Sequence, residues 1–469
     1  MAATDAALRG PWLDEFWTVH LADSRQGLAN LVRDGWLHDT HPPVFNAWAT
    51  LLATLGVTSI PAGRLVSNLL AAGLMILASL RFVRRMPGQS GFAAAFLLLT
   101  LSLPQAVETF ASYRSYFWQM AAIAVLVQVA RHVASTPADL DLRKDLDLAV
   151  IATVATAGAI AMHYVGGLFG GLLAGAVAAC ALIRGLRRWA MLMLASAGLS
   201  GLFVVAMVLI QATNWTDELD HSWIDTPIDQ ALAVPLALAL IALCHNPVAL
   251  IGLWIGRRTF DRSDRTLVAV IAGTLAAGVA LALAIHAFMP IVVERYLYAI
   301  PVLVSALMAV PAARLVAHGV LFGLLALVSI VVVAGHLVDT GLQPKWRESA
   351  RTISRIVQGC PTTQVFAASG WVPGPAAETR AAQREDPVFA RAYRALAREH
   401  GYAVTFLGLN SQVHVTLRRC PVLLWFEHTP NEAEDEPLLA VHDAGLTGLE
   451  EARLSVYRSA TGFVVRAEQ

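Results

Sequence analysis

The most constraining feature of the sequence is a series of apolar segments between residues 42 and 337. A membrane-spanning helix needs roughly 20 apolar residues, because the hydrocarbon layer is about 30 Å thick and a helix rises 1.5 Å per residue. The stretch 43–57 is apolar but only 15 residues long, so we expect an interfacial or re-entrant helix there. We predict ten spanning helices, over residues 64–80, 91–107, 113–130, 148–161, 165–183, 189–211, 231–256, 267–288, 296–313 and 317–337.

The composition excludes several other classes of protein. Of the 469 residues, 57% are hydrophobic and 14% are charged, whereas a soluble domain is about 45–50% apolar and about 25% charged. This apolar composition therefore excludes a soluble enzyme of this size and a disordered chain. A disulfide scaffold is excluded because there are only 4 cysteines. The net charge of +0 offers no basic excess for nucleic acid.

The chain divides into three regions. We expect an extracytoplasmic acidic loop with the interfacial helix at 1–60, a helical membrane domain at 61–337 and a soluble extracytoplasmic α/β domain at 338–469. In the last region, the patterns predict helices and strands but no nucleotide loop, nucleophile elbow or zinc spacing. The predicted helices cover 346–358 and 387–399, and the predicted strands cover 363–367, 403–407, 421–426, 453–458 and 462–467.

The distribution of cations predicts how the loops alternate across the membrane. Positive charge in short loops stays in the cytoplasm. If 43–57 does not cross, alternate loops hold 14 cations on one face, and the opposite loops hold only Arg114 and Arg295. If 43–57 crossed, residues 1–41 would lie apart from the other Arg-poor loops. We therefore expect the first loop and the C-terminal domain outside, where an oxidising compartment would allow a Cys360–Cys420 disulfide that the spacing alone does not decide.

An ordered set of motifs accompanies this topology. The motifs are Trp12-Leu13-Asp14-Glu15, Asp39-Thr40-His41-Pro42-Pro43-Val44-Phe45, Gly63-Arg64-Leu65, Tyr113-Arg114-Ser115-Tyr116, His163-Tyr164-Val165-Gly166, Glu294-Arg295-Tyr296-Leu297 and Lys345-Trp346-Arg347-Glu348-Ser349-Ala350. This ordered set resembles the polyprenyl-phosphate-dependent glycosyltransferases of GT-C fold, a group that includes the protein O-mannosyltransferases and the bacterial aminoarabinose transferases. The resemblance covers most of residues 11–350, but family members have a span before the acidic loop, and this chain starts directly in that loop.

The resemblance implies an enzyme of the bacterial inner membrane that transfers a sugar from polyprenyl phosphate to a hydroxyl of an envelope glycan, lipid or protein, with inversion. Asp14 would be the general base, with Glu15 assisting or binding a metal, so a divalent cation is left open. Arg114 and Arg295 would hold the donor phosphate, because guanidinium groups offer paired donors to phosphate oxygens. The expected substrate-binding residues are Asp39, His41, His163 and Tyr296.

Each of these residues also has a structural interpretation. Asp14 and Glu15 suit a solvated helix start, and Asp39 suits the N-cap of the helix that follows. Arg114 and Arg295 are long enough to reach lipid headgroups from within the bilayer, and His163 suits an interfacial belt. At the level of function, the rival hypotheses are a transporter or flippase for lipid-linked sugars, and an envelope assembly protein without catalytic activity.

Overall fold

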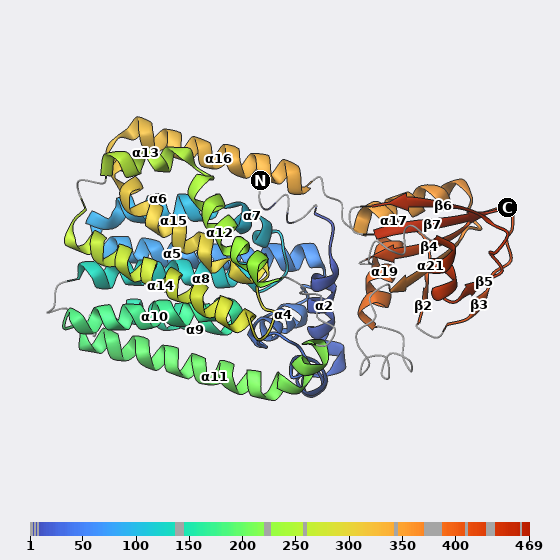
Figure 1. Cartoon of the computed structure of the whole chain (residues 1–469), viewed down its shortest axis with the longest axis horizontal. Helices are drawn as coiled ribbons and strands as arrows, with labels where there is room; N and C mark the ends of the chain where they lie inside the picture. The colour runs from blue at the N-terminus through green and yellow to red at the C-terminus, as the bar shows by residue number, and fades with distance from the viewer. Residues whose placement is uncertain are drawn as a thin grey trace. The chain divides into compact units, whose positions relative to one another are not determined.

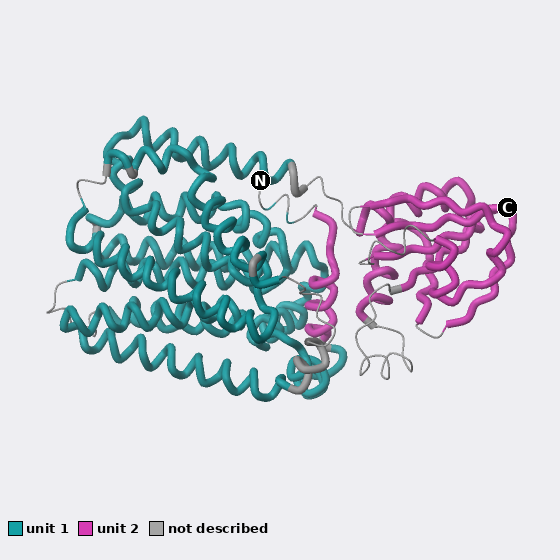
Figure 2. The backbone as a smooth tube through the Cα atoms, viewed as in Figure 1, with its two compact units in different colours: residues 1–7, 24–215, 222–340 teal, residues 8–23, 216–221, 341–469 magenta. Residues whose placement is uncertain are grey.

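The structure is a computed structural model in which the chain forms two compact units (Figure 2). The helical unit comprises residues 1–7, 24–215 and 222–340, and the C-terminal unit comprises residues 8–23, 216–221 and 341–469. Each unit is described by itself. The described residues are 3, 6, 9–136, 145–219, 227–256, 260–341, 346–369, 387–408, 411–427, 437–459 and 462–469.

The helical unit is a bundle of long apolar helices that run side by side (Figure 1). Short 3-10 turns lie at Glu294–Leu297 and Ala313–Ala317, and a π-helix covers Leu31–Trp36. The helices are α3 (Leu28–Asn30), α4 (Val44–Thr54), α5 (Ile60–Arg85), α6 (Ser90–Leu101), α7 (Pro104–Phe110), α8 (Tyr116–Ser135), α9 (Leu146–Ala161), α10 (Tyr164–Ile183), α11 (Arg187–Leu219), α12 (Ile228–Cys244), α13 (Pro247–Gly256), α14 (Arg262–His286), α15 (Ala299–Ala312) and α16 (Gly319–Gly341).

Each predicted spanning segment is helical, although not all are long enough to cross a bilayer alone. Among the described residues, seven helices pass a test of length and apolar composition, and the pair α6 and α7, bent by 66°, makes an eighth. The segment 148–161 is α9, with 16 residues. The segment 231–256 is broken, because Pro247 disfavours helical geometry at the residue before it and α12 ends at Cys244. The helix α4 has 11 residues, which agrees with a stretch too short to span.

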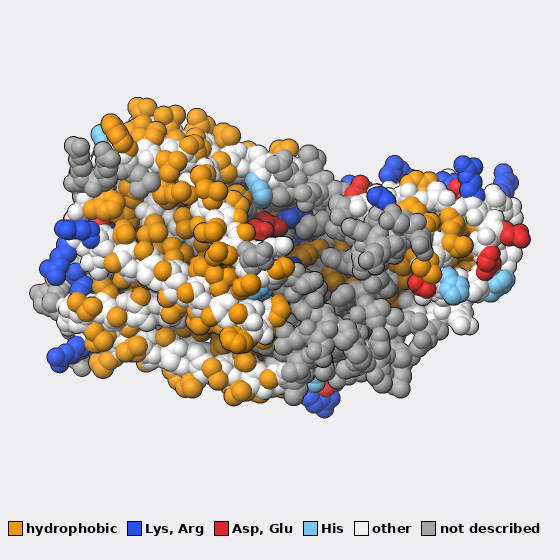
Figure 3. All heavy atoms as spheres, in the orientation of Figure 1, with side chains coloured by type: hydrophobic (Ala, Val, Ile, Leu, Met, Phe, Trp, Pro, Cys, Tyr) orange, Lys and Arg blue, Asp and Glu red, His pale blue; other side chains and the backbone are white. Residues whose placement is uncertain are grey.

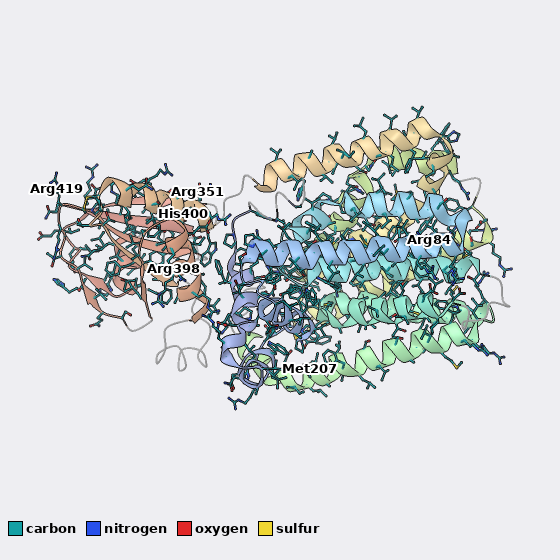
Figure 4. The ribbon with its side chains drawn as sticks, turned by 180° about the vertical axis from the view of Figure 1, so that it is seen from behind. Arg84, Met207, Arg351, Arg398, His400 and Arg419 are labelled. Atoms are coloured by element: carbon teal, nitrogen blue, oxygen red, sulfur yellow. A yellow bond between two sulfur atoms is a disulfide. The ribbon has the colours of Figure 1, made fainter. Side chains whose placement is uncertain are left out.

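The two ends of the helical unit differ in charge. Figure 3 shows hydrophobic side chains over the visible face of this unit and basic side chains gathered at one end. There Asp264 accepts from Arg131 at 2.6 Å and from Arg314 at 2.9 Å, so a buried carboxylate joins three of the loops that the charge pattern places on one face. Arg84 and Met207 lie toward opposite ends (Figure 4). Four of the 14 cations lie outside the described residues: Arg143, Lys144, Arg257 and Arg258.

The C-terminal unit is an α/β domain, as predicted. Its main sheet has the order β2-β1-β4-β7-β6, with β2, β1 and β4 parallel and β7 and β6 antiparallel, and a small parallel pair joins β3 and β5. A disulfide, which the sequence left open, joins Cys360 to Cys420, whose Cα atoms are 5.6 Å apart. The elements are α2 (Leu13–Leu21), α17 (Trp346–Gly359), β1 (Gln364–Ser369), α19 (Pro387–Glu399), β2 (Thr405–Leu407), β3 (Val413–His414), β4 (Val422–Glu427), α21 (Pro437–Asp443), β5 (Leu446–Thr447), β6 (Arg453–Arg458) and β7 (Gly462–Glu468).

The N-terminal helix α2 packs within the C-terminal unit. Phe16 contacts the ring of Trp346 with centroids 5.7 Å apart, and Trp346 is fully buried. Asp23, just after α2, accepts from Arg391 of α19 at 3.0 Å. The buried aromatic core therefore holds α2 against helices that come more than 300 residues later in the chain.

Candidate functional site

Four loops of the helical unit bring the predicted polar residues together. Asp39 and His41 precede α4, Arg114 precedes α8, His163 precedes α10, and Tyr296 lies in the 3-10 turn before α15. Hydrogen bonds and ring contacts link all four loops. The four loops therefore form one cluster, which we call the loop cluster: Asp39, His41, Arg114, His163 and Tyr296.

A carboxylate, an imidazole and a guanidinium form a chain in the loop cluster. The Nη2 atom of Arg114 lies 3.2 Å from Nε2 of His41, and Nδ1 of His41 lies 3.5 Å from Oδ1 of Asp39. Arginine has donors only, so the Nε2 atom of His41 must accept and its Nδ1 atom faces Asp39 as the donor. Arg114 is 6% exposed and Asp39 is 4% exposed, so the two charged ends of this chain are almost out of contact with water, whereas His41 between them is 19% exposed.

Asp39 is held as a carboxylate. Burial by itself would raise its pKa, but hydrogen bonds from His41 and Asn46 and the positive charge of Arg114 outweigh burial and lower the pKa below the usual value. Asn46 lies on α4 and donates from Nδ2 to Oδ2 of Asp39 at 3.0 Å. The alternative that Asp39 is the N-cap of α4 is wrong, because Pro43 occupies that position.

Aromatic rings surround the imidazole of His163. Its ring centroid is 4.5 Å from that of Tyr296 and 5.4 Å from those of His41 and Tyr116. Burial, followed by the nearby His41, Arg114 and Arg295, lowers the pKa of His163 well below its usual value, so this side chain is a neutral imidazole. Its Nδ1 atom is buried and has no hydrogen-bond partner among the described residues.

Arg295 lies at the same cluster. Its guanidinium carbon is 5.6 Å from the ring centroid of Tyr296, and its charge acts on His163. The charges of the two phosphate-binding candidates, which lie on different loops, therefore both act on the imidazole of His163.

Two carboxylates lie beside the loop that carries Arg295. Tyr298 donates its hydroxyl to Oε2 of Glu108 at 3.3 Å. Partial burial and the negative charge of Glu108 raise the pKa of Glu294, against a hydrogen bond from Gln105. This part of the site consequently has acidic groups next to a basic one, an arrangement that suits a substrate rich in hydroxyl groups.

The remaining catalytic candidates, Asp14 and Glu15, lie on α2 in the C-terminal unit. Glu15 is fully buried and its Oε2 atom accepts from the backbone N–H of Trp12 at 3.3 Å, which gives it a role at the start of the helix. Asp14 is half-buried, and its backbone carbonyl accepts from the hydroxyl of Thr18 at 3.1 Å.

Several residues that build the site were missed at the level of sequence. Asn46 and Tyr298 contact the acidic side chains, yet neither belongs to a motif with an expected role. Polar residues next to apolar helices are costly there, and this cost is the signal that could have identified Asn46.

The part of the chain that the structure describes holds no group of three or more His, Cys, Asp or Glu side chains placed to bind a metal ion. The loop 212–229, rich in acidic residues, lies largely outside the described side chains.

The charge of Asp39 should make the stability of the protein depend on pH. A carboxyl group whose pKa is lowered by folding stabilises the fold above its unfolded pKa of about 3.9, and this contribution is lost as the pH falls through the folded pKa. We expect Asp39→Asn to lower the melting temperature at pH 7, and the deficit to shrink below about pH 4. Thermal unfolding in detergent, followed from pH 7 to below about pH 4, measures both effects.

Asp34→Asn is the matched control for this experiment, because Asp34 is exposed and forms an ion pair with the exposed Arg33. Such surface pairs contribute little to stability. A deficit for Asp39→Asn that stays constant with pH, or equals that of the control, would contradict the assignment of Asp39 as a buried carboxylate.

Comparisons with known proteins identify the fold. No protein-family model and no curated protein matches the sequence. Two solved structures of ArnT from Cupriavidus metallidurans match 99% of this chain and 95% of theirs at 12% identity. The TM-score is 0.56 for the apo state and 0.54 for the structure bound to undecaprenyl phosphate. The chain therefore has an ArnT-like fold of the GT-C type, as the motifs indicated.

Proposed function

We propose that the protein is a membrane glycosyltransferase that moves a sugar from a polyprenyl phosphate to an acceptor hydroxyl of the cell envelope. The observation that carries the proposal is that two separate loops bring Arg114 and Arg295 to one cluster. Arg114 lies 3.2 Å from His41, Arg295 lies 5.6 Å from the ring centroid of Tyr296, and the rings of His41 and Tyr296 are 6.4 Å apart. The likeness to a structure of ArnT bound to undecaprenyl phosphate supports the lipid class of the donor.

The two arginines suit the leaving group of this reaction. The acceptor oxygen attacks the anomeric carbon, the bond from that carbon to the phosphate oxygen breaks, and its electron pair leaves with the phosphate. Guanidinium groups bind phosphate oxygens through charge-assisted hydrogen bonds, which strengthen as negative charge develops. Arg114 is oriented for this task, because the imidazole of His41 accepts one of its N–H groups and Asp39 fixes that imidazole.

The other residues of the loop cluster suit the sugar. The neutral imidazole of His163 offers Nδ1 to a hydroxyl group, and the adjacent ring of Tyr296 provides a flat surface. Asp39 and His41 position the guanidinium of Arg114, in addition to any contact that they make with the substrate. Small-molecule sites commonly combine apolar walls with a few precisely placed polar groups.

A base must take the proton of the acceptor hydroxyl, and we assign this role to Asp14. Its half-buried side chain lies one residue before Glu15, whose carboxylate is engaged at the start of α2. The aromatic and ionic contacts of α2 with α17 and α19 would fix the direction of Asp14. On this proposal, the C-terminal unit supports the base.

We also propose that the loop cluster faces the outside of a bacterial inner membrane. The basic end of the helical unit fits the cytoplasmic side, since positive loops stay there. A disulfide in the C-terminal unit fits an oxidising compartment.

Removing Arg295 should weaken the binding of the donor lipid. We expect Arg295→Ala to raise the Kd for undecaprenyl phosphate by roughly tenfold to a hundredfold, the effect of losing a charge-assisted hydrogen bond. Binding of labelled lipid to the purified protein measures this Kd.

Arg84→Ala is the control, because Arg84 is an exposed arginine at the end of α5, toward the basic end of the helical unit. Equal affinities for wild type and Arg295→Ala would argue against a phosphate site.

Removing the proposed base should stop transfer without affecting lipid binding. We expect Asp14→Asn to reduce kcat by a factor of about 100 or more and to leave the Kd for undecaprenyl phosphate unchanged. Transfer from a radiolabelled polyprenyl-phosphate sugar in membranes measures the rate. Glu15→Gln serves as the comparison, since it should mainly lower stability. Wild-type protein that binds the lipid without any transfer would favour a transporter or an assembly protein.

The orientation is accessible to chemical labelling. In a chain with Cys180 and Cys244 replaced by Ala, we expect Asp14→Cys to react with an impermeant maleimide added to intact spheroplasts. Arg187→Cys, at the start of α11, should react only after the membrane is permeabilised. The reverse pattern would overturn the proposed orientation.

A further inference from the structure

Several polar side chains are buried within the apolar helices of the helical unit, and four of them bond to loops of the loop cluster. Asn68 lies on α5, Gln119 on α8, Gln211 on α11 and His286 at the end of α14. Asn68 and Gln211 are 0% exposed, and Gln119 and His286 are 4% and 6% exposed. A polar group buried in an apolar environment costs free energy unless it is hydrogen-bonded, so the partners of these four side chains are informative.

Two of them hold the backbone just before the two arginines. The Nδ2 atom of Asn68 donates to the carbonyl oxygens of Phe110 and Ser112, each at 2.8 Å, and Arg114 follows two residues later. The Nδ1 atom of His286 accepts from the backbone N–H groups of Ile291 at 3.0 Å and Val292 at 3.1 Å. Arg295 follows three residues after Val292.

The other two hold the loops that carry the histidines. Gln119 donates from Nε2 to the carbonyl oxygens of Ala159 and His163, both at 3.2 Å. A Cβ atom on Gly166 would overlap the Gln119 amide, so the glycine leaves room for this side chain.

Gln211 makes the corresponding contacts on the first loop. Its Nε2 atom donates to the carbonyl oxygens of Trp36 at 2.8 Å and His41 at 3.2 Å. Its Oε1 atom accepts from the hydroxyl of Tyr164 at 2.5 Å, which fixes the amide so that Nε2 faces the loop.

The four contacts follow one pattern: each side chain from a membrane helix bonds to the main chain of a different loop of the loop cluster. We propose that Asn68, Gln119, Gln211 and His286 are positioning residues, which fix the four loops and so set the direction of Arg114, Arg295, His41 and His163. None of the four is assigned to contact the substrate. The consequence for catalysis rests on the proposed function, whereas the consequence for the loops does not.

A buried amide elsewhere in the same unit provides the contrast. Asn246 is 0% exposed and its Nδ2 atom donates to the carbonyl oxygen of Leu325 at 3.1 Å and to the hydroxyl of Ser329 at 2.9 Å, both on α16. These two hydrogen bonds tie Asn246 to a helix and not to a loop of the loop cluster. Its replacement should lower stability without altering the loop cluster.

His286 gives the sharpest test, because its bonds are made by exchangeable amides. We expect His286→Phe, measured in the full-length protein in detergent, to speed hydrogen exchange in the segment 290–298 about tenfold, the effect of losing a net hydrogen bond. His286→Asn should restore slow exchange, because the Oδ1 atom of asparagine can accept where Nδ1 of histidine does. Asn246→Ala should lower the melting temperature and leave exchange in 290–298 unchanged.

Undecaprenyl phosphate binding to the same variants tests the functional consequence. We expect His286→Phe to raise the Kd about tenfold and His286→Asn to stay close to wild type. Unchanged exchange in His286→Phe, or equal loss of affinity in Asn246→Ala at matched stability, would overturn the inference. A wild-type protein that does not bind the lipid would instead refute the proposed function, while the exchange result would still decide whether His286 fixes its loop.

Gln211→Met is the second variant, in case His286→Phe does not fold. It removes both bonds to the first loop and keeps a side chain of similar length. We expect faster exchange over residues 36–41 and no change over 290–298. Faster exchange throughout the protein would show that the amide only stabilises the bundle, and would overturn the inference.

Discussion

The cost of an unpaired polar group in an apolar environment is the constraint on which the helical unit depends. Arg114 is almost fully buried, yet a guanidinium is tolerable there because His41 accepts from it and Asp39 supplies the opposing charge. The same cost applies at the other end, where Asp264 lies between Arg131 and Arg314. Charged groups consequently occur at the two ends as connected networks, and the lipid-facing surface between them is apolar.

The distribution of roles between the two units follows from their composition. The helical unit supplies a rigid framework with loops at one end, and loops on a rigid scaffold commonly carry function. The C-terminal unit is an ordinary α/β domain whose aromatic core also holds α2, with Asp14 on it.

Much of the fold was predictable, because spanning helices and alternating strands leave strong periodic signals. The limits of α19, Pro387–Glu399, agree with the prediction, and His41, Arg114 and His163 meet as their loops indicated. Averaged hydropathy hides single polar residues, so Gln211 and His286 gave no signal within their apolar segments. The place of α2 was also unpredictable, since no local pattern reveals a partner such as Trp346 more than 300 residues away.

The most direct measurement is an experimental structure of the protein with undecaprenyl phosphate. The account predicts phosphate oxygens at hydrogen-bond distance, about 3 Å, from the guanidinium groups of Arg114 and Arg295, with His163 beside them. A phosphate bound instead among the arginines of the opposite end, near Arg131 and Arg314, would contradict it.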